Sequence, residues 1–181
     1  MSTPRWYAIA TKPRHEKVVS KQLQSGSFES FLPVIRTLSR WKDRRVAIER
    51  PIFPGYVFTR IDLLERTTLY TVPGIVRIVS FNGKPAPIDD SEIEGVRMCL
   101  TRGRSPAPYP FPALGDRVIV VSGALQGLRG LVVRNNKQTR IVVSIHLIHQ
   151  SVSVEIDANL LEPDDGTWII DSEYTTNEAR L

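Results

Sequence analysis

The sequence has few of the residues that build catalytic and metal sites. Its 181 residues include one cysteine, Cys99, and three histidines, His15, His146 and His149. A lone cysteine excludes an internal disulfide, and no histidine has the spacing of a metal site or of a nucleophile with its base. The glycines of the C-terminal half precede β-branched runs and not a helix, so no phosphate-binding loop is predicted. We therefore expect a binding protein without metal or cofactor, not an enzyme.

Long hydrophobic runs are missing as well. The longest, such as 118–121 and 141–145, are far shorter than the roughly 20 apolar residues that cross a bilayer as a helix. The N-terminal M-S-T-P-R-W has no hydrophobic segment behind its charge, unlike a secretory signal. Because 41% of the residues are hydrophobic, the chain can still bury a core. We expect a soluble, cytoplasmic monomer with no membrane contact.

Charge is distributed unevenly along the chain. The net charge is +5, and residues 1–60 contain twelve Lys or Arg against four Asp or Glu. From Glu162 onward the balance reverses, with six acidic residues against Arg180 alone. The basic half indicates nucleic acid or another acidic surface as a partner, and the acidic end indicates solvation or self-repulsion.

The stretch 51–58, P-I-F-P-G-Y-V-F, organises our interpretation. Two prolines and a glycine beside aromatic residues are poor sequence for a helix and good sequence for a turn that leads into a strand. Val57 and Phe58 cannot both face one side of that strand, so side chains should point to both faces. The stretch is then either a buried strand led by a Pro-Gly turn or a docking surface lined by rings. Its residue types alone leave both open.

The first hundred residues predict an α+β domain, an antiparallel sheet with helices packed on it. Strands are expected at 6–11, 28–34, 56–63 and 75–81, a hairpin at 36–50, and helices at 14–24, 63–70 and 89–103. The carboxylates at the start of the last helix, such as Asp89 and Asp90, are read as helix-start charges, not metal ligands.

The hairpin carries a cluster of cations at its tip. Arg40, Lys42, Arg44 and Arg45 lie beside Trp41, a combination suited to phosphates and to stacking on exposed bases. A solvated hairpin with no partner is the alternative.

The second half of the chain predicts an all-β unit. Four of the thirteen prolines fall in S-P-A-P-Y-P-F-P, so residues 102–113 are expected to be a linker between a domain at 1–101 and one at 114–163. Short β-branched segments then predict five strands in a small barrel. We expect the acidic tail, 164–181, to be disordered, with Trp168, Ile169 and Ile170 as its candidate docking residues.

The order of these motifs resembles the NusG family of bacterial transcription elongation factors, up to Pro163. The resemblance consists of W-Y near the start, P-I-F-P-G-Y-V-F, P-G-I-V-R-I-V followed by N-G-K-P-A-P-I, and G-D-R-V-I-V-V-S-G-A-L-Q-G-L-R-G, which looks like a KOW motif. It implies an N-terminal domain that binds the clamp helices of RNA polymerase, a linker, and an SH3-like KOW barrel that recruits partners. Such a factor suppresses pausing or termination.

Carried over by position, the resemblance implies three sets of contacts. The polymerase contacts fall on Phe53, Pro54, Tyr56, Phe58 and Phe81, with Thr67 and Thr68 matching part of a second contact on the opposite jaw. DNA of the transcription bubble would meet Lys12 and Arg14 together with Arg40, Lys42, Arg44 and Arg45. A partner of the KOW barrel, such as a ribosomal protein, would meet Leu125, Ile145, His146 and Leu147.

Within this resemblance, the sequences of the motifs favour a specialised antiterminator of the RfaH type, acting at particular operons, over the general factor. Where general members read S-I-F-G-R, this chain has Ser144-Ile145-His146-Leu147-Ile148, which argues against contact with the termination factor Rho. A ribosomal or other RNA-binding protein is the alternative, because KOW segments occur there too. RfaH-like relatives can hold the KOW segment as a helical hairpin, but the β-branched residues and three glycines here predict a barrel that leaves Phe53 and Tyr56 uncovered.

Overall fold

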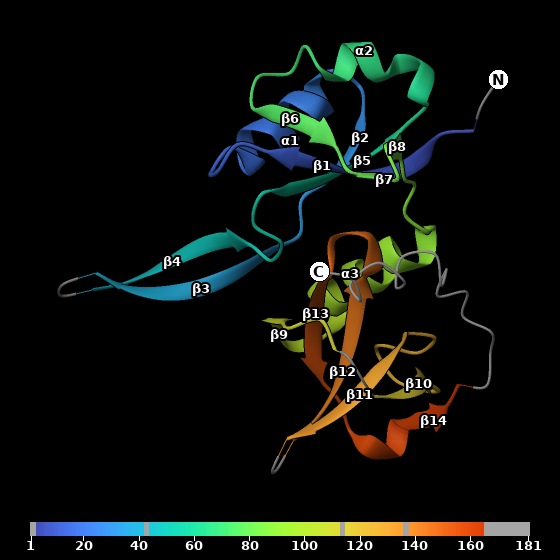
Figure 1. The fold of residues 1–181 in the computed structure, drawn as a ribbon. Coiled ribbons are helices and arrows are strands. Elements are labelled where there is room, and N and C mark those ends of the chain that lie inside the picture. Colours follow the sequence, from blue (N-terminus) through green and yellow to red (C-terminus); the bar gives the residue numbers. More distant parts are fainter. Residues whose placement is uncertain (1–2, 42–43, 113–114, 136–137, 165–181) are drawn as a thin grey trace, which may run out of the picture.

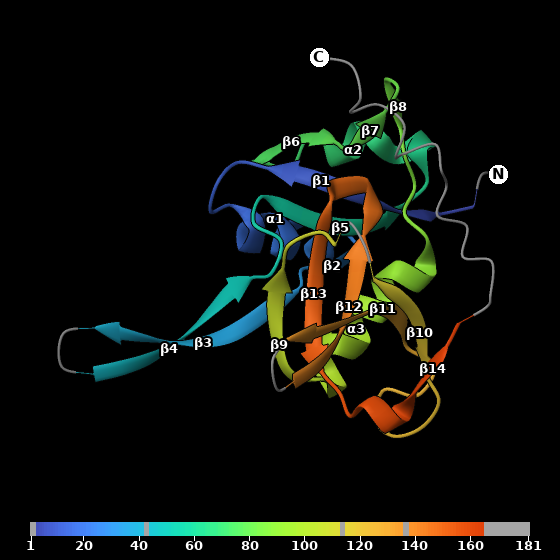
Figure 2. The same ribbon diagram turned by 60° about the horizontal axis from the view of Figure 1, so that its bottom comes forward.

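Two antiparallel sheets with a helix between them form the framework of the protein. The computed structural model describes residues 3–41, 44–112, 115–135 and 138–164. Figure 1 shows the N-terminal sheet at the top, the C-terminal sheet at the bottom, and a two-stranded hairpin that projects away from both. The hairpin still projects when the molecule is turned (Figure 2), so it is clear of the body in both views.

The N-terminal sheet has the strand order β2-β5-β1-β6, and all its neighbours are antiparallel. Side chains alternate between its two faces along β1: Tyr7 and Ile9 point to one hydrophobic cluster, and Trp6 and Ala8 to another. This confirms the predicted α+β domain. Its strands are β1 (Arg5–Thr11), β2 (Glu29–Phe31), β5 (Tyr56–Ile61) and β6 (Ile75–Ile78).

The first face of this sheet is covered by helices, as expected. Helix α1 (Glu16–Ser25) packs Val19 and Leu23 against it, and Leu69 of the short helix α2 (Arg66–Leu69) joins them. A 3-10 turn, η1 (Leu63–Glu65), precedes α2.

The second face is covered by helix α3 (Asp90–Arg102). Its N-cap, Asp89, accepts a hydrogen bond from the Ser91 amide at 2.8 Å, which satisfies one of the free donors at a helix start. The Arg97 guanidinium lies 5.2 Å from the centre of the Trp6 ring and 5.0 Å from that of Phe31. These cation–π contacts fix α3 against the sheet.

The C-terminal part is a six-stranded sheet in the order β14-β10-β11-β12-β13-β9. Residues after 114 supply five strands, as predicted, and β-branched side chains such as Val118, Val143 and Val154 fill its inner face. These strands are β10 (Asp116–Val120), β11 (Arg129–Asn135), β12 (Gln138–Ile145), β13 (Gln150–Glu155) and β14 (Leu161–Pro163), with 3-10 turns η2 (His146–Ile148) and η3 (Ala158–Leu160) between the last three.

The proline-rich segment does not form the free linker expected at 102–113. Helix α3 runs to Arg102, and β9 (Arg104–Tyr109) pairs directly with β13. Proline is tolerated there because β9 is an edge strand, where only one side of the backbone needs its hydrogen bonds. Arg140 holds β9 in place, since its guanidinium donates to the Ser105 carbonyl at 2.7 Å and to the Ser153 carbonyl at 3.1 Å.

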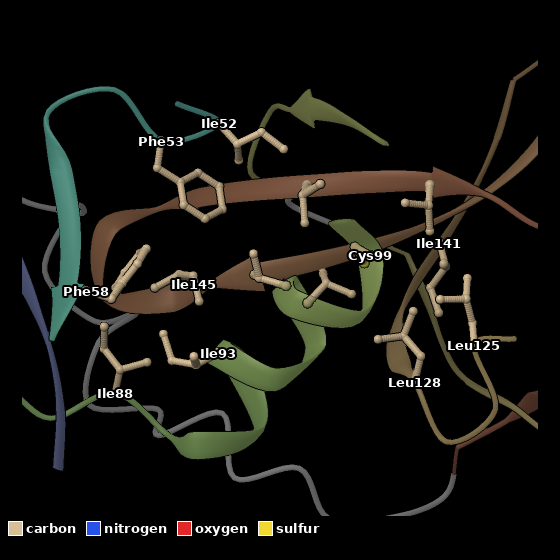
Figure 3. Packing of buried hydrophobic residues seen from close by; sticks show 14 of the residues in the cluster. Ile52, Phe53, Phe58, Ile88, Ile93, Cys99, Leu125, Leu128, Ile141 and Ile145 are labelled. Atoms are coloured by element: carbon tan, nitrogen blue, oxygen red, sulfur yellow. The ribbon is translucent and has the colours of Figure 1, made fainter. Parts of the chain in front are cut away.

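The two halves share one hydrophobic core. Phe53 and Phe58 of the N-terminal half belong to the same buried cluster as Ile145 of β12. Figure 3 shows both rings pointing toward Ile145, with Ile93 of α3 beside them. The prediction of a loosely tethered barrel that leaves Phe53 uncovered is therefore wrong for this conformation, although the segment is β-structured as predicted. The physical reason is that the inner faces of α3 and of the C-terminal sheet are both apolar, so each removes the other from water when they pack together.

A glycine within α3 allows the close approach of helix and sheet. A Cβ atom at Gly95 would lie 3.0 Å from Cγ1 of Val143 and 3.6 Å from Cδ1 of Leu128. Glycine inside a helix costs about 1 kcal/mol relative to alanine. Its presence where the helix packs against Val143 and Leu128 indicates that the sequence is adapted to this contact.

Removing the Arg140 side chain should release β9. Arg140→Ala loses the hydrogen bonds to Ser105 and Ser153 and the ion pair with Glu155 (3.2 Å), which should lower the free energy of unfolding by about 2 kcal/mol. Hydrogen exchange should accelerate at the amides of β9 more than at those of β11. The control Arg134→Ala removes an exposed arginine near the end of β11 and should change neither quantity. Equal acceleration in both strands would contradict a specific role for Arg140.

A side chain at position 95 should separate the helix from the C-terminal sheet. Burial raises the pKa of the Cys99 thiol to about 12, so almost no reactive thiolate exists near pH 8 while α3 and the C-terminal sheet are packed together. Gly95→Leu should expose Cys99, lower its pKa and raise its rate of alkylation at least tenfold. Glu94→Leu, at an exposed position of the same helix, is the matched control. An unchanged alkylation rate with native circular dichroism would show that the contact at Gly95 does not hold the halves together.

Candidate functional site

The candidate site is built on a tight turn between β4 (Arg44–Pro51) and β5. Gly55 has a φ of +84°, which suits glycine, and the Tyr56 amide donates to the Phe53 carbonyl at 3.2 Å. The Glu16 carboxylate of α1 accepts a hydrogen bond from the Gly55 amide at 2.8 Å. This buried contact between a helix and a turn gives Phe53 and Tyr56 a rigid base.

The turn and the start of β5 bring together four of the residues predicted to contact polymerase. Phe53 is 1% exposed and Phe58 0% exposed, with their rings edge to face at 6.0 Å between centroids. Tyr56 is half-buried against the same cluster, and Pro54 is exposed. Of the two alternatives that the sequence left open, the buried strand is the one seen here, because the C-terminal sheet and α3 cover the rings.

The other predicted polymerase contacts lie on separate elements. Phe81 is half-buried on β7 (Ser80–Phe81), which turns through Asn82 and Gly83 into β8 (Lys84–Pro85). Thr67 and Thr68 are exposed on α2. Thr67 also lines a hollow of about 810 Å³ together with Arg5 and Arg66. This hollow is therefore a second surface, distinct from the aromatic turn.

The sequence analysis missed the contribution of α3. Gly95 of α3 faces Val143 and Leu128 of the C-terminal half, and Cys99 of the same helix belongs to the buried cluster that contains Phe53 and Phe58. The periodic apolar positions of the helix predicted one buried stripe, whereas α3 is buried on two sides. A glycine inside an otherwise regular helix was the available signal.

A polar contact fastens the same interface. Glu92 of α3 accepts hydrogen bonds from both His146 Nδ1 at 2.8 Å and the His146 amide at 3.3 Å. Phe111 stacks on His149, with 5.0 Å between ring centroids, and meets His146 edge to face at 5.6 Å. The first turn of α3 is thereby joined to the loop after β12.

This arrangement corrects the predicted partner surface of the KOW unit. Ile145 and Leu125 are buried in the shared core, Leu147 is half-buried against it, and His146 is bonded to Glu92. The cause is strand alternation, which turns Ile141, Val143 and Ile145 inward toward α3. None of these hydrophobic side chains is freely available to a partner in this conformation.

The basic residues predicted to meet DNA lie in the loop before α1 and on the projecting hairpin. Lys12 and Arg14 are exposed in the loop before α1. At the tip of the hairpin, formed by β3 (Val34–Trp41) and β4, the register pairs Arg40 with Arg45 and Trp41 with Arg44. Lys42 lies outside the described residues.

A salt-bridge network links α1 to the base of the hairpin. Glu49 lies between Lys17 and Arg36, with N–O distances of 3.3 Å and 3.4 Å. The hydrogen bond from Lys17 is the main cause of a lowered pKa at Glu49. Lys17 and Lys21 were not among the predicted site residues, and their i, i+4 spacing places them on one exposed helix face, from which Lys17 contacts the hairpin.

Within the described residues, no group of three or more His, Cys, Asp or Glu side chains could hold a metal ion. Likewise, none of the described helices is long and apolar enough to cross a membrane.

Comparison with known proteins identifies the family. A family model described as transcription termination factor nusG matches residues 4–97. A transcription termination/antitermination protein NusG from Pseudomonas aeruginosa is 28% identical over 173 residues, covering 87% of this chain and 97% of its own. The corresponding protein of Helicobacter pylori J99 is 26% identical, covering 83% and 93%, and that of Thermus thermophilus 24% identical, covering 84% and 94%.

Among solved structures, one described as domain interaction in Thermotoga maritima NusG aligns with 88% of this chain and 97% of its own, at 18% identity and a TM-score of 0.47. A crystal structure of the MjSpt4:Spt5 complex, conformation B, aligns at 15% identity with a TM-score of 0.30, covering 87% and 95%. The family match covers more than half of the chain, including both the aromatic turn and the hairpin. The chain therefore belongs to the NusG family of transcription termination and antitermination factors.

Proposed function

We propose that this transcription factor binds RNA polymerase through the aromatic turn and the adjoining face of α3, after the C-terminal sheet has moved away. The main support is that Phe53 and Phe58 sit on a rigid turn yet share their core with Ile145, a residue of another sheet. Aromatic anchors on a fixed backbone bury a large area at a small entropic cost, as in protein-binding hot spots. The clamp helices of polymerase are the partner that the family resemblance indicates.

Binding to polymerase must then compete with the closed form, the conformation described above in which the C-terminal sheet covers Phe53 and Phe58. The apparent affinity of a protein falls in proportion to the fraction of molecules in the competent state. Glu92 and His146 join α3 to η2, and Gly95 permits the close approach of Val143, so both features favour the closed form. A factor that needs opening suits recruitment at particular operons better than continuous association. This supports the specialised, RfaH-like assignment.

The hairpin and the loop before α1 would contact DNA at the same time. Support comes from the projection of the hairpin (Figures 1 and 2) and from the number of basic residues in its sequence near the tip. Thr67 and Thr68, beside the hollow lined by Arg5 and Arg66, are suited to a second contact with polymerase. A protein that bridges polymerase and DNA in the elongating state disfavours pausing only if it binds that state better than the paused one. The factor would act in the bacterial cytoplasm.

The proposal is tested by transcription through a terminator with and without the protein. We expect increased readthrough, and co-elution of the protein with core RNA polymerase. Co-elution with ribosomal subunits instead would favour the alternative of an RNA-binding structural protein.

Tyr56 should be the more informative of the aromatic residues. Phe53→Ala would open a cavity in the shared core and destabilise the whole protein by about 3 kcal/mol, which confuses binding with folding. Tyr56→Ala removes a half-buried ring and should weaken polymerase binding by about 2 kcal/mol, roughly 30-fold, with little loss of stability. Titration of labelled core polymerase measures both variants. An unchanged affinity in Tyr56→Ala would contradict the proposed surface.

Charge reversal at the hairpin tip should affect DNA-dependent activity alone. Replacing Arg40, Lys42, Arg44 and Arg45 with glutamate should weaken binding to elongation complexes and flatten its salt dependence by about one unit of slope for each lost phosphate contact. Affinity for free polymerase should stay the same. As a control, glutamate at Arg102, an exposed residue at the end of α3, should alter neither measurement. Equal losses with and without DNA would assign the hairpin to the protein contact.

A further inference from the structure

The hollow lined by Arg5 and Arg66 lies between the start of β1 and the segment that follows β5. Its volume of about 810 Å³ falls in the range of about 300–1,000 Å³ that small-molecule sites have in proteins. Arg5 and Tyr7 are two residues apart on β1, so both side chains point to the face of the sheet that α1 and α2 cover. The lining is completed by residues before β1 and around η1 and α2: Thr3, Asp62, Leu63, Leu64, Arg66 and Thr67.

Tyr7 presents a hydroxyl group to this hollow. Its ring is packed in the hydrophobic cluster beneath α1, and the residue is only 6% exposed. Among the described residues the hydroxyl has no hydrogen-bond partner, yet the side-chain polar atom found there to be both enclosed and unpartnered is Oγ1 of Thr11. The Tyr7 oxygen therefore keeps access to the hollow that the residue lines. Burial raises the pKa of Tyr7, so the hydroxyl stays protonated near neutral pH and can donate a hydrogen bond.

Two arginines make the hollow attractive to an anion. Arg5 and Arg66 are both exposed, and neither forms an ion pair within the part of the chain that the structure describes. Asp62 is the acidic residue of the lining, and its carboxylate accepts a hydrogen bond from the Leu64 amide at 2.9 Å. Two cations against one carboxylate leave the lining with an excess positive charge.

The number and kind of donors favour a phosphate group. Hydroxyls of Thr3, Tyr7 and Thr67 accompany the two guanidinium groups, which is more than the two oxygens of a carboxylate require. A phosphate monoester has three terminal oxygens and a charge of about −1.5 to −2 near pH 7, and guanidinium groups bind it with paired hydrogen bonds. Leu64, 79% exposed, adds an apolar wall beside these donors. A nucleotide combines such a phosphate with an apolar face on its base.

We propose that this hollow binds the terminal phosphate of a nucleotide between Arg5, Arg66 and the Tyr7 hydroxyl, with the base against Leu64. The nucleotide is either free in solution or the 5′ end of a nucleic-acid strand, since both carry the same phosphate monoester. This site does not require the C-terminal sheet to move, and it is independent of the function proposed for the aromatic turn.

The test is a titration of the full, isotopically labelled chain with adenosine and guanosine 5′-monophosphate, followed by amide chemical shifts. We expect both nucleotides to shift the signals of Tyr7, Leu64 and Arg66, and inorganic phosphate to shift the same signals at concentrations about fivefold higher or more, because it lacks the contact with Leu64. Adenosine and guanosine should shift none of them. Absence of shifts with the nucleotides, or equal shifts with the nucleosides, would overturn the proposal. So would equal shifts with a short polyglutamate peptide, which would assign the hollow to carboxylates.

Variants separate a phosphate site from weak general attraction. Tyr7→Phe keeps the ring in the core and should weaken nucleotide binding about fivefold, the value of one hydrogen bond. Arg5→Gln combined with Arg66→Gln should weaken it by about tenfold or more. The matched control is Arg77→Gln, at an exposed arginine of β6 outside the lining, and it should leave the affinity unchanged. Native circular dichroism with full affinity in the double variant would overturn the proposal.

A final comparison distinguishes the two sources of the phosphate. A 5′-phosphorylated hexanucleotide that shifts the Leu64 and Arg66 signals more strongly than the mononucleotides would assign the site to a strand end, and weaker shifts would assign it to a free nucleotide. Both outcomes support a terminal phosphate. Equal shifts from the same hexanucleotide without its 5′ phosphate would overturn the proposal, because the hollow would then bind internal phosphates.

Discussion

The burial of Phe53 and Phe58 beneath the C-terminal sheet is the contact on which the rest of the structure depends. Each ring would expose a large apolar area if the two halves separated, and so would Ile145 and the inner side of α3. The hydrophobic effect therefore makes one core out of two units that each have the pattern of a domain. Under the proposed function the same contact also governs binding, because a ring that completes this core cannot simultaneously fill a groove on polymerase.

Polar contacts fix the relative orientation of α3 and the C-terminal sheet more than they add to the stability of this interface. The Glu92 carboxylate and the His146 ring are both partly exposed, so their hydrogen bonds are screened by water. Their geometry is nevertheless specific, since one carboxylate accepts from both the ring and the backbone amide of a single residue. Arg97 works similarly on the other side of α3, stacked on Trp6 and Phe31. Helix α3 is thus oriented toward both sheets, and apolar packing supplies most of the stability.

Local sequence signals predicted most of the elements. Pro54-Gly55 and Asn82-Gly83 form the turns expected of them, and Asp89 begins α3 as a helix cap should. The errors concern tertiary relations. Prolines at 106 and 108 read as a linker because an edge strand that accepts proline can be recognised only when its neighbour is known. Of the candidate site, the sequence identified the residue types and the turn, but whether Phe53 is covered depends on the match between two faces that lie about ninety residues apart.

The stability of the closed core also sets the free energy that recruitment must supply to uncover the aromatic turn. If the closed form were favoured by about 2.8 kcal/mol, the apparent affinity of the aromatic turn for a partner would fall roughly 100-fold. The DNA binding proposed for the hairpin would not require opening, because β3 and β4 project away from the shared core in both views. A first contact through the hairpin would raise the local concentration of the closed protein at polymerase without exposing a single ring. Opening beside the clamp helices would then exchange one apolar partner for another, so the rings need not face water for long. A rigid turn that is buried in both states suits that exchange better than a flexible one, since it loses no backbone entropy at either surface.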